Sequence, residues 1–157
     1  MSATLLAGIS RTTEPQTMLR RFLALDALVT GANGLAYVTG SGPLGRLLGI
    51  DDTVLLGLGV FLALFGAGVG YLATRRQPSR LPVTAVVDAN LLWAVLSVAA
   101  LTLWLEPTTA GAVWIPVQAL TVAGLAVLQW SALRAATTDL GGNSSRHGED
   151  PLQDQLL

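Results

Sequence analysis

The sequence predicts an all-α integral membrane protein, a four-helix bundle of four transmembrane helices with both termini in the cytoplasm (N-in/C-in). Its 157 residues are 52% hydrophobic and only 12% charged. The mean hydropathy is +0.58, and soluble domains of this size do not have such a composition. Four apolar runs are each near the length of about 20 residues that a helix needs to cross the hydrocarbon core.

The four expected helices form a transmembrane domain over residues 20–134, flanked by two polar ends. The spans are expected at about 22–40, 53–74, 83–105 and 110–133. Residues 1–19 are mixed and polar, which predicts a short, flexible, cytoplasmic N-terminal arm. Residues 135–157 are rich in Gly, Ser, Asp and Glu, which predicts a polar, disordered cytoplasmic tail.

Helix-breaking and capping residues separate the spans. The segment 41–52 contains glycines and a proline that break and then restart a helix, with leucines able to rest on the membrane surface, and it is expected to be a short outer loop. Asp52 is the expected N-cap of the second span, and Thr108 or Thr109 that of the fourth. Pro116 falls in the first turns of the fourth span, where we expect a bend or fraying.

The arginines predict the orientation. All nine basic residues are arginine, a usage typical of a bacterial protein from a GC-rich genome. In a four-span topology only Arg46 falls on the outer side. The other eight fall on the side of the termini: Arg11, Arg20, Arg21, Arg75, Arg76, Arg80, Arg134 and Arg146. Because positive charge stays in the cytoplasm, we expect a multi-pass protein of the inner or plasma (cell) membrane with both termini cytoplasmic.

The composition argues against several classes of function. The chain has no cysteine, and its single histidine, His147, lies in the polar tail, so we expect no metal site and no cofactor. The net charge of −1 argues against nucleic acid as a partner. No phosphate loop, nucleophile elbow, zinc-protease motif or dinucleotide fingerprint is present. We therefore expect no catalytic residues and no enzyme.

Two acids inside the predicted spans are the best candidates for function, because an ionised carboxylate at a helix centre costs about 2.5–3.5 kcal/mol on insertion scales. Counted from the cytoplasmic ends, Asp26 and Asp88 lie about 6–8 Å deep at helical rise. Tyr71, Asn90 and Gln129 fall near the same depth. The sequence thus predicts a polar layer in the inner leaflet with contributions from all four helices.

Two arrangements of this layer remain open. In one, Asp26 and Asp88 face each other across the bundle and share a proton or hold a cation. In the other, each acid pairs with arginines at the cytoplasmic ends, whose long side chains reach along the interface. The first arrangement predicts a site, and the second a role in topology and packing.

Polar residues also follow one face of two spans. On the first span the face consists of Asp26, Thr30, Asn33 and Tyr37. On the fourth it consists of Trp114, Gln118, Thr121, Leu125 and Gln129. These stripes predict inward-facing residues that either line a narrow hydrated path or hydrogen-bond the helices to one another.

The second span carries small residues at helical spacing, namely Gly59, Ala63, Gly66 and Gly70. Such a face allows close approach of a second helix backbone. It is available either to another helix of the same bundle or to a second copy of the chain.

Two functions follow from these patterns. The first is a structural or accessory membrane bundle without a catalytic site, whose partners are the lipid bilayer and another membrane protein or a homodimer. The second is a proton- or cation-coupled carrier of a small cationic or amphipathic solute that uses Asp26 and Asp88. A membrane enzyme acting on lipid is a third and weaker interpretation.

Overall fold

The computed structural model describes residues 2–144, and the burial of side chains from 15 to 138. In this part the chain folds as α1 (Ser2–Leu48), α2 (Asp52–Thr74), α3 (Arg80–Leu103) and α4 (Thr109–Ser144). All four are long and apolar enough to cross a membrane, over Pro15–Leu48, Asp52–Thr74, Arg80–Leu103 and Thr109–Thr138. The fold is all-α, and its helices are compatible with a small multi-pass membrane protein.

The first and last helices extend beyond the expected spans. Residues from Ser2 onward, expected as a flexible arm, belong to α1. At the other end α4 continues to Ser144, ten residues into the expected tail, and the rest of that tail lies outside the described residues. Hydropathy locates the end of an apolar stretch, whereas a helix continues as long as its backbone hydrogen bonds do.

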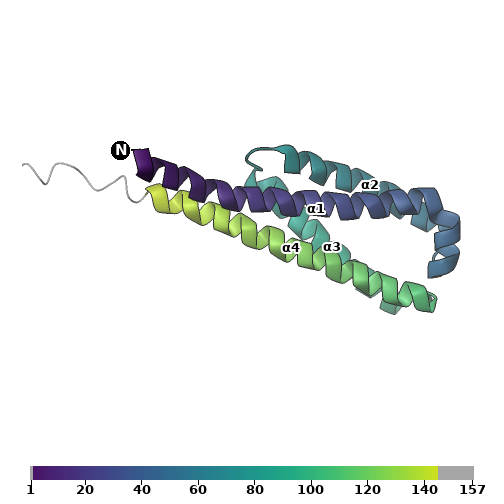
Figure 1. The fold of residues 1–157 in the computed structure, drawn as a ribbon. Coiled ribbons are helices and arrows are strands. Elements are labelled where there is room, and N and C mark those ends of the chain that lie inside the picture. The colour runs from purple at the N-terminus through teal and green to yellow at the C-terminus, as the bar shows by residue number, and fades with distance from the viewer. Residues whose placement is uncertain (1, 145–157) are drawn as a thin grey trace, which may run out of the picture.

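A bend at Gly40 divides α1. Its φ of −121° and ψ of 20° lie outside helical values, and a short helical segment follows as far as Leu48. The expected short outer loop over 41–52 is therefore wrong for residues 41–48, which are helical, and only 49–51 lie outside a helix. Figure 1 shows the segment turning away from the axis of α1 toward the beginning of α4. There the hydroxyl of Thr108 donates to the carbonyl oxygen of Leu47 at 2.5 Å, which joins the end of α1 to the start of α4.

One of the two expected helix caps is confirmed, and the other lies one residue earlier than expected. Asp51, and not Asp52, is the N-cap of α2, because its Oδ1 accepts hydrogen bonds from the backbone nitrogens of Thr53 at 2.9 Å and Val54 at 3.1 Å. Asp52 is already within the first turn. At the start of α4, the hydroxyl of Thr108 accepts from the backbone nitrogen of Gly111 at 3.3 Å, so Thr108 is the cap.

The small-residue face of α2 packs against α1 of the same chain. A Cβ at Gly66 would lie 2.8 Å from the backbone nitrogen of Gly31, and one at Gly34 would lie 2.5 Å from that of Ala63. Gly59 is in equally close contact with α1, near Tyr37. Gly70 is looser, since a Cβ there would meet the Cβ of Ala27 at an ordinary 3.5 Å. The α1–α2 contact therefore depends on the absence of side chains.

The helices are not packed equally. α1 contacts α2 closely and also α4, and α3 packs mainly on α4, while α2 and α3 scarcely touch. Two core clusters lie at different levels. The first consists of Leu19, Leu23, Val69, Ala73, Val83, Val86, Ala132 and Leu133. The second consists of Tyr37, Leu48, Leu55 and Leu62. On α1, Asp26 and Thr30 lie between the two clusters. At this level a gap separates α2 from α3.

Candidate functional site

The carboxyl group of Asp26 is fully buried and lies at the centre of a hydrogen-bond cluster. On its own helix, the hydroxyl of Thr30 donates to Asp26 Oδ1 at 3.0 Å. From α3, Asn90 Nδ2 donates to Asp26 Oδ2 at 2.7 Å, and from α4, Gln129 Nε2 donates to the same oxygen at 2.8 Å. We call Asp26, Thr30, Asn90 and Gln129 the Asp26 cluster. It joins α1, α3 and α4 at one level.

Neutral side chains surround this acid. All three donors are uncharged, so an ionised Asp26 keeps its full negative charge. The neighbouring arginines make other contacts, since Arg20 Nε donates to the backbone carbonyl of Ala73 at 3.0 Å and Arg75 donates to the hydroxyl of Tyr71. No arginine forms a hydrogen bond with Asp26 within the described residues 15–138. The expected pairing of this acid with arginines is thus not what the geometry shows.

The predicted polar layer is only partly assembled. The structure brings together Asp26, Asn90 and Gln129, each less than 4% exposed. Asp88 lies on the exposed face of α3, and Tyr71 is 61% exposed on α2, where the guanidinium of Arg75 lies 4.6 Å from its ring centre. Asp26 and Asp88 therefore do not face each other across the bundle.

One polar atom of the Asp26 cluster has no partner. Gln129 is fully buried, and its Oε1 forms no hydrogen bond within the part of the chain that the structure describes. Buried polar groups are nearly always paired, so this acceptor is an exception within the cluster. The same part of the chain contains no group of three His, Cys, Asp or Glu side chains that could hold a metal ion.

A second polar cluster lies further along α1. The hydroxyl oxygen of Tyr37, a residue only 7% exposed, accepts hydrogen bonds from Trp114 Nε1 at 2.8 Å and from Gln118 Nε2 at 2.5 Å, both on α4. Asn33 is half-buried between the two clusters. Thr121 is exposed, and its hydroxyl donates to a backbone carbonyl of its own helix. The stripe on α4 therefore faces inward at both glutamines and not at Thr121.

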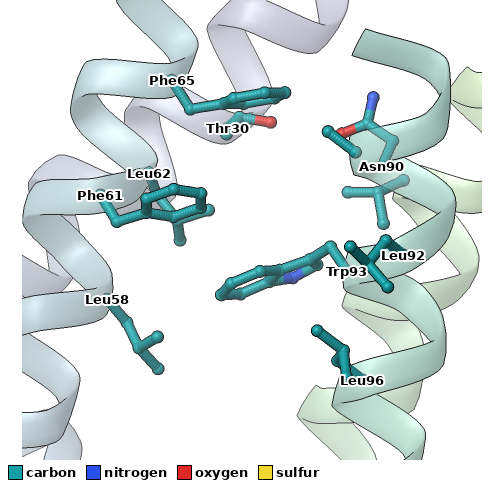
Figure 2. Close-up of a pocket in the computed structure, with 11 residues that line it drawn as sticks. Thr30, Leu58, Phe61, Leu62, Phe65, Asn90, Leu92, Trp93 and Leu96 are labelled. Atoms are coloured by element: carbon teal, nitrogen blue, oxygen red, sulfur yellow. The ribbon is translucent and has the colours of Figure 1, made fainter. Parts of the chain in front are cut away.

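The gap between α2 and α3 is a groove of about 340 Å³. Its walls carry aromatic and aliphatic side chains from both helices, and Thr30 and Asn90 also line it (Figure 2). The ring of Phe61 stacks between those of Phe65, at 6.2 Å, and Trp93, at 5.9 Å. The groove therefore has apolar walls and reaches two members of the Asp26 cluster.

A second cavity of about 290 Å³ continues the groove. The two share Leu58, Trp93 and Leu96, and the second extends to Tyr37 and Gln118. The gap thus runs beside both polar clusters, with Trp93 between them.

Most of the polar residues of the site were predicted from the sequence, whereas its aromatic wall was not. Trp93 lies near the middle of the expected third span, where the usual role of a tryptophan is packing. The spacing of Phe61 and Phe65 at i and i+4 places both rings on one face of α2 and is the signal that could have marked this wall.

Comparison with protein-family models, with curated proteins and with solved structures finds no match to this chain.

Proposed function

We propose that this protein is a multi-pass protein of the bacterial cell membrane that acts as a non-enzymatic accessory bundle, supporting or regulating another membrane protein. One observation carries the proposal: the buried carboxyl group of Asp26 accepts hydrogen bonds from side chains of three helices. Interhelical hydrogen bonds of this kind hold helices together where lipid provides no hydrophobic driving force. The small-residue face of α2 is occupied by α1, so it supports the bundle itself.

The distribution of arginines supports an orientation with both termini in the cytoplasm. The start of α1 and the end of α4 lie side by side at one end of the bundle (Figure 1). The arginine-rich turn between α2 and α3 lies at the same end of the bundle. The parts of α2 and α3 next to this turn contribute to the first core cluster, and so do Leu19 of α1 and Ala132 of α4. Arg46 lies beyond the bend at Gly40, near the start of α4. The positive-inside rule then assigns the arginine-rich end to the cytoplasm.

Single-cysteine labelling tests this orientation. The chain contains no cysteine, so each introduced thiol is unique. Ser79 and Glu106 are exposed, and Ser79 makes no side-chain capping bond, so replacing either does little to the fold. We expect a membrane-impermeant maleimide to label Glu106→Cys in intact spheroplasts, and Ser79→Cys only after the membrane is opened. Labelling of Ser79→Cys in intact spheroplasts would reverse the orientation, and recovery of the protein from cytosol would reject membrane insertion.

The accessory role is favoured over a carrier that uses both acids. Such a carrier needs Asp26 and Asp88 close enough to exchange a proton or cation. Asp88 lies on an exposed face, whereas Asp26 is fully buried, so the geometry supplies no common site. The hydrogen bonds of Asp26 are used to join helices.

A comparison of flux with abundance tests the accessory role. We expect Asp26→Asn to lower the amount of assembled protein in membranes, because an amide at this position provides one acceptor oxygen in place of two. Asp88→Asn is the matched control and should leave the amount unchanged, since Asp88 is exposed. In proteoliposomes with an imposed pH gradient, the wild-type protein should add no proton flux to that of empty liposomes. Flux that the wild type adds and Asp26→Asn abolishes would instead establish a carrier.

A further inference from the structure

The groove between α2 and α3 differs in polarity along its length. Figure 2 shows Thr30, Phe65 and Asn90 at one end of the groove, and Leu58 and Leu96 at the other, with Trp93 projecting between the two helices. A ligand that matches it has one polar end and an apolar body. Because the groove opens between α2 and α3, such a ligand can enter it from the surrounding lipid.

The polar end of the groove presents acceptors and not donors. Asn90 directs its nitrogen to Asp26, and Figure 2 shows its amide oxygen pointing toward the gap. The hydroxyl of Thr30 uses its proton on Asp26, which leaves its lone pairs as acceptors. A polar ligand end that pairs with the oxygens of Thr30 and Asn90 therefore carries more than one donor.

The negative charge of Asp26 also favours a ligand with a positive charge. The Asp26 carboxylate lies directly behind Thr30 and Asn90, and no charged side chain hydrogen-bonds to it within the described residues. In a low-dielectric interior an ionised carboxyl group is costly unless it takes up a proton or a positive charge lies close to it. A primary ammonium provides both the positive charge and three N–H donors.

We propose that the groove between α2 and α3 binds a primary alkylammonium, with the nitrogen at Thr30 and Asn90 beside Asp26 and the alkyl chain along Phe61 and Trp93. The second cavity, which shares Leu58 with the groove, leaves room for a longer chain. The ammonium donates to the oxygens of Thr30 and Asn90, and its charge is offset by the carboxylate behind them. This binding requires no transport, so it adds to the accessory role and does not depend on it.

The binding is tested by titrating octylammonium, and separately octan-1-ol, into the full-length protein in phosphatidylcholine nanodiscs. The two probes share their alkyl chain and differ in charge. Protein-free nanodiscs provide the blank for partition into lipid. We expect isothermal titration calorimetry to give a Kd for octylammonium at least about tenfold lower than that for octan-1-ol. Equal affinities for both probes, or no binding above the blank, would overturn the proposal.

Three variants locate the site. Asp26→Asn removes the charge and should weaken octylammonium binding by about tenfold or more while leaving octan-1-ol binding within about twofold. Ala89→Leu adds a larger side chain to the lining of the groove, replaces no member of the Asp26 cluster, and should abolish binding of both probes. Ala85→Leu, one turn earlier on an exposed part of α3, should change neither.

Because Ala89→Leu retains all four residues of the Asp26 cluster, it tests the groove even if Asp26→Asn fails to fold. Binding that is unchanged in Ala89→Leu would place the probe elsewhere and reject the groove as the site. The measurement is made at equilibrium without a gradient, so its failure leaves the accessory role standing. Proton flux in the liposome experiment would likewise leave the binding result unaffected.

Discussion

Asp26→Ala is expected to lower the free energy of unfolding of the bundle by about 2–3 kcal/mol. The substitution removes two interhelical hydrogen bonds and one intrahelical hydrogen bond, each of about 0.6–1 kcal/mol. The amide groups of Asn90 and Gln129, less than 4% exposed, would then be left without their acceptor. A donor stranded in a buried site costs more than the bond itself contributes. The expected effect is therefore large for the removal of one short side chain.

Unfolding by dodecyl sulfate in mixed micelles, followed by tryptophan fluorescence, measures this effect. Asp88→Ala is the matched control, because it removes an exposed acid from the adjoining helix, and it should leave the unfolding midpoint unchanged. A double-mutant cycle with Asn90→Ala should show a coupling of about 0.5–1.7 kcal/mol with Asp26→Ala. Equal midpoints for the Asp26 and Asp88 variants would show that the Asp26 cluster does not hold the bundle together.

Gly34→Ala is expected to destabilise the bundle by about 1–3 kcal/mol, the usual range for overpacking. The added methyl would lie 2.5 Å from the backbone nitrogen of Ala63 and 2.9 Å from the carbonyl oxygen of Gly59. Backbone atoms cannot move aside as a flexible side chain can, so α1 and α2 must separate. Their separation would also disturb Tyr37, which packs against the same stretch of α2.

Gly68→Ala is the matched control for this substitution. It lies on α2, two residues from the closely packed Gly66, yet a Cβ there meets nothing within 4 Å. The general gain of helix propensity from glycine to alanine acts on both variants, so their difference isolates the close approach. We expect the midpoint of dodecyl sulfate unfolding to fall for Gly34→Ala and to stay or rise for Gly68→Ala. Similar midpoints would mean that the α1–α2 contact is not closely packed.

The level of the candidate site along the helices was predictable from the sequence, but the rotation of each helix about its axis was not. Counting residues from the span ends correctly placed Asp26, Asn90 and Gln129 at one level, and the structure joins them by hydrogen bonds. The same count also included Asp88, although Asp88 and Asn90 are two residues apart and thus about 200° around an α-helix. Only one of the two can face α1. Which one does so depends on how α3 packs against its neighbours.

The number, order and approximate limits of the four apolar helices were determined by the sequence alone, because hydropathy and helix length are local properties. Capping was nearly determined as well, with Thr108 among the two expected residues and Asp51 one position from the expected one. Tertiary structure decided which helices touch. The absence of a side chain at Gly34 and Gly66 allows α1 and α2 to pack closely. The large rings of Phe61 and Trp93 lie where α2 and α3 remain apart. Whether a side chain becomes core or groove depends on the residues opposite it, and those come from distant parts of the chain.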